Sequence, residues 1–263
     1  MLIAAFNVKR LGRAKINNPD VLKNLIKIVS RYSVVVMLEV VDQSGEAMEM
    51  FLEELNDFRP NRNNQYSMIC SESLGRGTYR EQFVFFYRED EATIINQYQY
   101  EEEGNVDVLV REPFIVQFNC PNTVVQNLVL IPVHTKPEDA ETELSALHDV
   151  VQDAIRKMKT KNIMILGDFN ADGPYFPEAR RGNIRLGKPP YHWLIDDDVD
   201  TTTSDNNDRT YDRIVVYGDQ MKRAVVTNSA QPFDFKTTFR LSAVAAAAVS
   251  DHYPVEVELK ERR

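Results

Sequence analysis

The sequence predicts an α/β fold, a four-layer α/β/β/α sandwich in which two packed mixed β-sheets are flanked by helices. Two observations support this prediction. Apolar runs of strand length recur along the whole chain and lie between polar or turn residues, as buried strands do. Three amphipathic stretches of helical length separate some of these runs. So few helices suggest that the sheets pack on each other and that the helices cover the outside.

Eight runs carry the strand pattern and are mostly apolar on both faces, which is typical of strands covered on two sides. They are Leu2–Val8, Val34–Leu38, Phe83–Tyr87, Phe114–Phe118, Leu128–Val133, Ile163–Leu166, Arg213–Val216 and Val255–Leu259.

Three helices are expected, each with one apolar stripe. The first covers Pro19–Tyr32, because Asn18 can cap it and proline suits the first helical position. The second runs from about Ser44 to Asn56. The third covers about Glu138–Lys159 and has the clearest stripe.

Composition limits the classes of protein that this chain can belong to. It has 263 residues, 43% of them hydrophobic, and no repeat or linker, so we expect a single domain over residues 1–263. The longest weakly polar run, Ala243–Val249, is far shorter than the about 18–20 residues of a membrane span, so no membrane partner is expected. The net charge of −9 disfavours nucleic-acid binding unless bound cations and local basic groups such as Lys9 and Arg10 offset it.

Polar side chains recur at the ends of the expected strands. They are Asn7, Glu39, His134, Asp168, Asn170, Asp212, Asp251 and His252. A single polar residue at a strand end needs no functional explanation, because strands end at the surface and polar residues lie there. Eight such residues make surface exposure alone a weaker explanation. Strand ends of a sandwich gather along one edge, so these side chains can converge.

The residue types in this group indicate metal-assisted hydrolysis. Hard oxygen ligands suit magnesium, manganese or calcium rather than zinc. With only two cysteines, neither in a paired motif, a zinc cluster is not expected. Two histidines with additional carboxylates provide two possible acid–base dyads. Together these groups fit the hydrolysis of a phosphate ester.

Several short motifs carry a resemblance that covers nearly the whole chain. Gly167-Asp168-Phe169-Asn170-Ala171 and Ser250-Asp251-His252-Tyr253-Pro254 are typical of one superfamily of nucleases and phosphatases. Leu74-Gly75-Arg76 and Arg111-Glu112-Pro113 point to one branch of it. The sequence thus resembles the deoxyribonuclease I-like endonucleases. Their wider endonuclease/exonuclease/phosphatase superfamily also holds abasic-site endonucleases, sphingomyelinases and inositol polyphosphate 5-phosphatases.

The resemblance implies catalytic and metal-binding roles for the polar residues. His134 would pair with Glu81 and His252 with Asp212, and we assign His252 as the general base and His134 as the general acid. Asn170 would stabilise the pentacoordinate phosphorus. The catalytic Mg²⁺ or Mn²⁺ would be held by Glu39, with Asp168, Asp251 and Asn7 in or beside the ligand group.

The resemblance also implies a substrate, double-stranded DNA, cut with 5′-phosphate ends. Arg76, Tyr79 and Arg111 match positions that contact the backbone or sugar in the minor groove, and Lys9 is a further basic candidate. Because such contacts carry little sequence information, we expect low sequence specificity. Two alternatives remain open. One is a phosphatase or phosphodiesterase acting on a phosphoinositide or sphingomyelin, and the other is a non-catalytic DNA-binding homologue.

The chain departs from the secreted members of that family. The segments that carry their disulfides have no cysteine here, so Cys70 and Cys120 are expected to be reduced thiols. The lack of these cysteines favours a cytoplasmic location, extending to the nucleus. If a signal peptide has been removed, the expected location is instead outside the cell. The residues typical of tight actin binding are absent around Met68-Ile69-Cys70, so actin is not an expected partner. A monomer is the default expectation.

Two structural calcium sites of the family survive in part. Asp107 and Glu112 match one site, and Asp200 with Thr202 resembles the other. The arginine that follows the Glu-Val step in the family is Val41 here, so one phosphate contact is expected to be missing.

Overall fold

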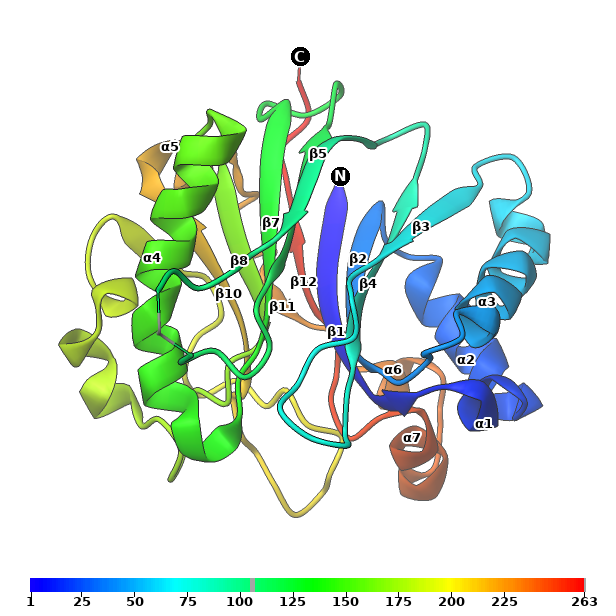
Figure 1. The fold of residues 1–263 in the computed structure, drawn as a ribbon. Coiled ribbons are helices and arrows are strands. Elements are labelled where there is room, and N and C mark those ends of the chain that lie inside the picture. Colours follow the sequence, from blue (N-terminus) through cyan, green and yellow to red (C-terminus); the bar gives the residue numbers. More distant parts are fainter. Residues whose placement is uncertain (105–106, 263) are drawn as a thin grey trace.

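The computed structural model describes residues 1–104 and 107–262 and has the predicted four-layer α/β sandwich (Figure 1). Its strands are β1 (Leu2–Leu11), β2 (Val34–Val40), β3 (Tyr66–Cys70), β4 (Gln82–Arg88), β5 (Thr93–Gln99), β6 (Phe114–Asn119), β7 (Asn127–His134), β8 (Ile163–Asp168), β9 (Tyr191–Trp193), β10 (Asp212–Tyr217), β11 (Gln231–Pro232) and β12 (Val255–Glu258). Its α-helices are α1 (Arg13–Ile16), α2 (Pro19–Val29), α3 (Glu46–Asp57), α4 (Ala140–Met158), α5 (Gly218–Ala224), α6 (Phe235–Thr238) and α7 (Ala243–Val249). Short 3₁₀ turns cover Arg59–Asn61, Pro137–Asp139, Glu178–Asn183 and Arg185–Gly187.

Each sheet has six strands and mixed pairing. The first has the order β11-β12-β1-β2-β4-β3 and the second the order β5-β6-β7-β8-β10-β9. The pairs β1–β2 and β7–β8 are parallel, whereas the other strand pairs are antiparallel. All eight expected strands are present. The four that the sequence pattern missed, β3, β5, β9 and β11, are the four edge strands. They are short or partly exposed, so they lack a continuous apolar run.

The alternation of side chains along each strand explains the layers. In β2, Val34, Val36 and Leu38 pack between the two sheets, where they meet residues of β6, β7 and β8. Val35 and Met37 point the other way, into the core that α2 and α3 cover. In the second sheet, Ile163 and Ile165 contact α4 in the same manner. Burial on both faces is therefore why these strands are apolar throughout.

The three expected helices are present, but the expectation of only three was wrong. Asn18 caps α2 as predicted, because its Oδ1 accepts hydrogen bonds from Asp20 N and Val21 N at 3.1 and 3.3 Å. The missed helices α1, α5, α6 and α7 have four to seven residues, too few for a periodic stripe. Among the described residues, none of the helices is both long and apolar enough to cross a membrane.

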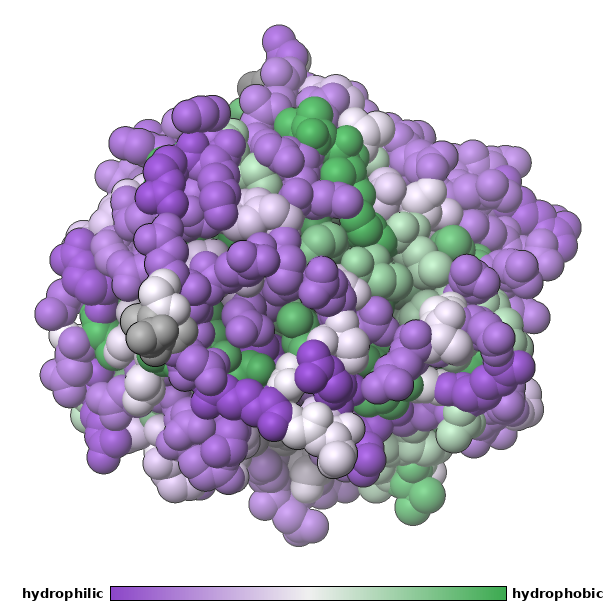
Figure 2. Space-filling view, viewed as in Figure 1, coloured by the Kyte–Doolittle hydropathy of each residue, from purple (hydrophilic) through white to green (hydrophobic). Residues whose placement is uncertain are grey.

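The outer surface is mostly hydrophilic, as Figure 2 shows. On this face apolar side chains gather over the neighbouring edge strands β3 and β5, where Ile95 is 53% exposed. Ile69 and Ile94 are partly buried against the core between the sheets. The apolar surface thus marks the side of the sandwich where the two sheets end.

Replacement of Gly167 should test how closely β7 and β8 must approach. Gly167 has φ +142°, and a Cβ there would lie 2.0 Å from Val133 O. Gly167→Ala should therefore lower the free energy of unfolding by about 3 kcal/mol or more, measured by urea denaturation. At Gly182 a Cβ meets nothing within 4 Å, so Gly182→Ala should change stability by less than about 0.5 kcal/mol. Equal stability of the two variants would contradict this account.

Candidate active site

Strand register brings three of the predicted residues into one row. His134 ends β7, Asp168 ends β8, and these two residues are direct partners in the parallel ladder. Asp212 begins β10 and is the antiparallel partner of Asp168. The pairing of β8 with β7 and β10 therefore creates this row, although the three residues lie far apart in the sequence.

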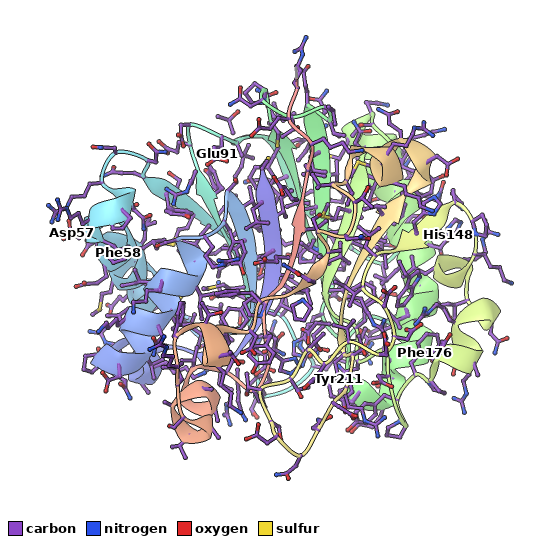
Figure 3. All side chains as sticks on the ribbon, turned by 180° about the vertical axis from the view of Figure 1, so that it is seen from behind. Asp57, Phe58, Glu91, His148, Phe176 and Tyr211 are labelled. Carbon is purple, nitrogen blue, oxygen red and sulfur yellow. The ribbon has the colours of Figure 1, made fainter. Side chains whose placement is uncertain are left out.

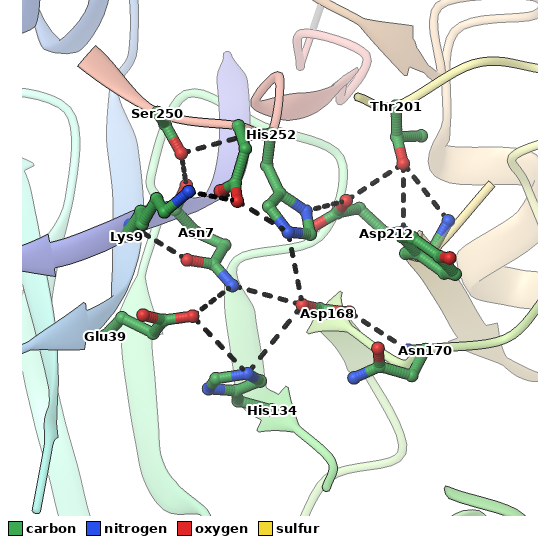
Figure 4. A network of polar contacts seen from close by, with 12 residues as sticks. Asn7, Lys9, Glu39, His134, Asp168, Asn170, Thr201, Asp212, Ser250 and His252 are labelled. Atoms are coloured by element: carbon green, nitrogen blue, oxygen red, sulfur yellow. Dashed lines mark hydrogen bonds and ion pairs between the residues drawn. The ribbon is translucent and has the colours of Figure 1, made fainter. Parts of the chain in front are cut away.

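The other sheet supplies the facing side chains (Figure 4). Asn7 lies in β1 and Glu39 in β2, on adjacent parallel strands. Asn7 Nδ2 donates to Glu39 Oε1 at 3.0 Å and to Asp168 Oδ2 at 3.1 Å. This amide thus joins the two sheets at the centre of the site.

Glu81 and His134 form the first dyad. Glu81 Oε1 lies 2.5 Å from His134 Nδ1, and both residues are buried. Burial lowers the pKa of His134, but the charge and hydrogen bond of Glu81 outweigh it, so the pKa lies above its ordinary value. Arg111 supports the pair, because its Nε lies 3.0 Å from Glu81 Oε1 and its guanidinium donates to His134 O at 3.2 Å.

Asp212 and His252 form the second dyad. His252 Nδ1 lies 2.7 Å from Asp212 Oδ2, and Thr201 Oγ1 donates to the same oxygen at 2.9 Å. Burial lowers the pKa of His252, but the negative charges of Asp212 and Asp168 raise it well above its ordinary value. Tyr211, labelled in Figure 3, lies beside this imidazole with ring centroids 6.3 Å apart.

The two dyads converge on Asp168. His134 Nε2 and His252 Nε2 each lie 3.7 Å from Asp168 Oδ2, so the two imidazole edges face the same carboxylate oxygen. Because each Nδ1 is held by a carboxylate, each Nε2 is left to exchange a proton with a reacting group. The arrangement can therefore supply one proton acceptor and one proton donor within the same site.

Asn170 lies beside this centre in a left-handed conformation, with φ 46°. Its backbone N donates to Asp168 Oδ1 at 3.0 Å, and its Nδ2 donates to Thr135 O at 3.0 Å. The amide is thus held in one orientation near Asp168.

The donor set fits a hard divalent cation. Carboxylate and amide oxygens gather around Asp168, as magnesium and manganese prefer. By distance alone, the ligand atoms of Asp168, Asp212 and His252 lie within 4.8 Å of one another. This set shares only Asp168 with the set predicted from the resemblance. Glu39 instead accepts from Asn7, and Asp251 Oδ2 lies 2.7 Å from Lys9 Nζ. Assignment of the ligands therefore stays a prediction.

The four residues expected to contact DNA occupy different surroundings. Tyr79 is 37% exposed, and its hydroxyl donates to Glu39 Oε2 at 3.2 Å, so it lies on the rim of the site. Lys9 is also exposed and pairs with Asp251. Arg76 pairs with Asp107 Oδ1 at 2.7 Å. Arg111 lies behind the first dyad, with 12% of its side chain exposed.

The candidate calcium residues lie in two separate places. Asp107 and Glu112 are joined by Glu102, which the sequence reasoning missed, and their oxygens lie within 4.8 Å of one another. At the second place, Asp200 Oδ1 accepts from both the backbone N and the hydroxyl of Thr202 at 2.8 Å.

Lys15 is a residue near the site that the sequence did not reveal. Its Nζ donates to Val8 O at 2.7 Å and to Val249 O at 2.6 Å. It therefore ties the strand that carries Asn7 to the helix that precedes Asp251. Burial lowers the pKa of this ammonium to about 8. A single lysine on a short helix resembles a surface residue in sequence, so no local signal could have identified it.

The two cysteines and the two other histidines take no part in the dyads. Cys70 and Cys120 are free thiols, as expected. Neither of the other histidines lies with the two dyads: His148 contacts the hydroxyl of Tyr191 at 2.7 Å, and His192 contacts Asp219 at 3.0 Å. His148 is labelled in Figure 3, well away from Tyr211.

Comparisons with known proteins show the family and the fold of the chain. The model of the Endonuclease/Exonuclease/phosphatase family matches residues 4–252. The chain is 42% identical over 259 residues to deoxyribonuclease-1-like 1 of Homo sapiens, covering 98% of this chain and 84% of that protein. It is 42% identical over 263 residues to deoxyribonuclease-1 of Sus scrofa, covering 98% and 91%. A solved structure of an endonuclease/exonuclease/phosphatase family protein from Leptotrichia buccalis has the same fold, with a TM-score of 0.67, 18% identity and 99% coverage of both chains.

Proposed function

Because the chain belongs to the deoxyribonuclease I-like family within the endonuclease/exonuclease/phosphatase superfamily, we propose that it is an endonuclease that hydrolyses phosphodiester bonds of double-stranded DNA. The observation that carries the proposal is the pair of carboxylate–imidazole dyads that face each other across Asp168. A protein that only binds DNA has no need of two such dyads.

Each of the two imidazoles carries out one of the two proton transfers. His252 Nε2 takes a proton from a water molecule, whose oxygen forms a bond to phosphorus. The bond between phosphorus and O3′ breaks, and His134 Nε2 gives a proton to the departing O3′. The products are a 5′-phosphate and a 3′-hydroxyl end. Asp212 and Glu81 hold the imidazoles at Nδ1 and stabilise the charge that each carries.

A divalent cation belongs at the same centre. Glu39, Asp168, Asp251 and Asn7 would hold it. When bound, Mg²⁺ or Mn²⁺ would neutralise the phosphate and lower the pKa of a nearby imidazole. Asn170, whose amide is held by Thr135, would stabilise the pentacoordinate phosphorus.

The substrate contacts are expected to read shape rather than sequence. Tyr79 and Lys9 lie exposed beside the catalytic groups, and Arg76 lies on the same loop as Tyr79. Arg111 is expected to act close to the scissile phosphate, because it adjoins His134. Contacts of this kind go to the DNA backbone and sugar, so sequence specificity should be low.

We further propose that the protein acts as a monomer and does not bind actin tightly. We also propose that it works in a reducing compartment, which suits its two free thiols.

Nicking of supercoiled plasmid tests the proposed activity. Wild-type protein should nick the plasmid with Mg²⁺ or Mn²⁺ and not with EDTA. His134→Ala and His252→Ala should each lose about 10²–10⁴-fold in rate, because each removes an acid–base group. His192→Ala is the matched control, since His192 lies outside the site beside Asp219, and it should keep the wild-type rate.

Two outcomes would refute this proposal. A folded wild-type protein that leaves plasmid intact in every metal would reject DNA hydrolysis, and phosphoinositide or sphingomyelin would become the next substrates to assay. A dyad variant that keeps more than about a tenth of the wild-type rate would reject the role of that histidine.

Calcium is proposed as a structural ion at Asp107 and Glu112, with Asp200 and Thr202 as a second site. Clustered carboxylates repel one another, so a bound cation stabilises the folded state by mass action. Calcium should therefore raise the melting temperature of EDTA-treated protein, and Glu112→Gln should reduce that rise. A melting temperature that calcium leaves unchanged would show that neither site binds it.

A further inference from the structure

We propose that Arg10 is a further residue that contacts DNA. Its guanidinium binds a phosphate of the duplex beside the scissile bond. This inference rests on the proposed DNA hydrolysis. It adds a specific cation to the substrate surface of a chain whose net charge is −9.

The backbone presents Arg10 at the rim of the site. The register between β1 and β2 shifts between Asn7 and Leu11, so the strand bulges there. Lys9 and Arg10 adopt left-handed conformations, with φ 41° and 55°. Such conformations are unfavourable for residues other than glycine and concentrate at functional sites. Both side chains are exposed, which agrees with a bulge that serves the site rather than the core.

Arg10 and Tyr79 are held on the same carboxylate. Arg10 N and Tyr79 Oη each donate to Glu39 Oε2 at 3.2 Å. The Arg10 guanidinium carbon lies 5.5 Å from the centroid of the Tyr79 ring, within the range of a cation–π contact. The guanidinium is therefore placed beside an aromatic ring at the edge of the catalytic centre.

The charge of Arg10 is available to a substrate, whereas four other basic side chains near the site have carboxylate partners. Lys9 pairs with Asp251, Arg111 with Glu81, Arg76 with Asp107 and Lys136 with Asp139. Within residues 1–104 and 107–262, by contrast, the Arg10 guanidinium has no carboxylate at ion-pair distance. A guanidinium suits a phosphate because its planar fork matches two phosphate oxygens.

Salt dependence separates a phosphate contact from an ordinary surface arginine. KM and kcat for plasmid nicking would be measured over a series of salt concentrations for wild type, Arg10→Gln and Arg10→Lys. Arg10→Gln should raise KM, leave kcat unchanged, and make the slope of log KM against log salt shallower by about 0.9, the contribution of one phosphate contact. Arg10→Lys should keep the wild-type slope, because it retains the charge.

The matched control is Arg223→Gln, which removes the same charge from an exposed position on α5. In Figure 1, α5 lies far from α7, the helix that precedes Asp251 of the site. It should keep the wild-type slope. Arg10→Asn provides a second neutral variant, since asparagine tolerates a left-handed backbone and would preserve the fold if glutamine did not. Slopes for Arg10→Gln and Arg10→Asn equal to wild type, with nicking intact, would overturn this inference alone. A wild-type protein that does not nick DNA would overturn both it and the proposed function.

Discussion

The carboxylate of Asp168 is the point on which the rest of the site depends. It accepts from Asn7 of the opposite sheet, faces Nε2 of both histidines, and is the register partner of both His134 and Asp212. Around it lie four other carboxylates, those of Glu39, Glu81, Asp212 and Asp251. Like charges at such short range disfavour the folded state unless cations or hydrogen bonds offset them. The two imidazoles, Lys9 and Arg111 supply part of that compensation, and a divalent cation would supply more.

The packing of the strands brings these charges together. Apolar residues bury both faces of the central strands, and the strands end together at one edge of the sandwich. Gly167 lets β8 approach β7 closely one residue before Asp168, so the polar ends are brought into register by the packing behind them. Asn7 then bridges the sheets at the same level. Stability and site geometry thus depend on the same strand contacts.

Much of this architecture could be predicted from the sequence, and the exceptions have physical reasons. The eight central strands were predictable because burial on both faces leaves a continuous apolar run. The edge strands β3, β5, β9 and β11 were not, because partial exposure allows polar residues there. The polar residues at strand ends suggested a site, and the family resemblance paired them into dyads. The structure places Glu81 against His134 and Asp212 against His252, at the distances that such dyads require.

Residues that act through long-range contacts left no local pattern. Glu102 lies with Asp107 and Glu112 only in the folded structure, and Lys15 meets Val249 across 234 positions of the chain. Likewise, within the described residues, Arg10 lacks a carboxylate partner whereas Lys9 and Arg76 each have one. Only the folded chain shows which basic groups are already paired.

Manganese binding to Asp168→Asn tests the central claim most directly, since asparagine keeps the shape of the side chain and removes its charge. The affinity for Mn²⁺ would be measured by electron paramagnetic resonance of the free ion, with excess Ca²⁺ present to occupy the acidic cluster of Glu102, Asp107 and Glu112. If Asp168 holds the catalytic cation, the affinity should fall at least tenfold, or about 1.4 kcal/mol. A folded variant that binds Mn²⁺ as tightly as wild type would contradict the assignment of Asp168 as the centre of the site.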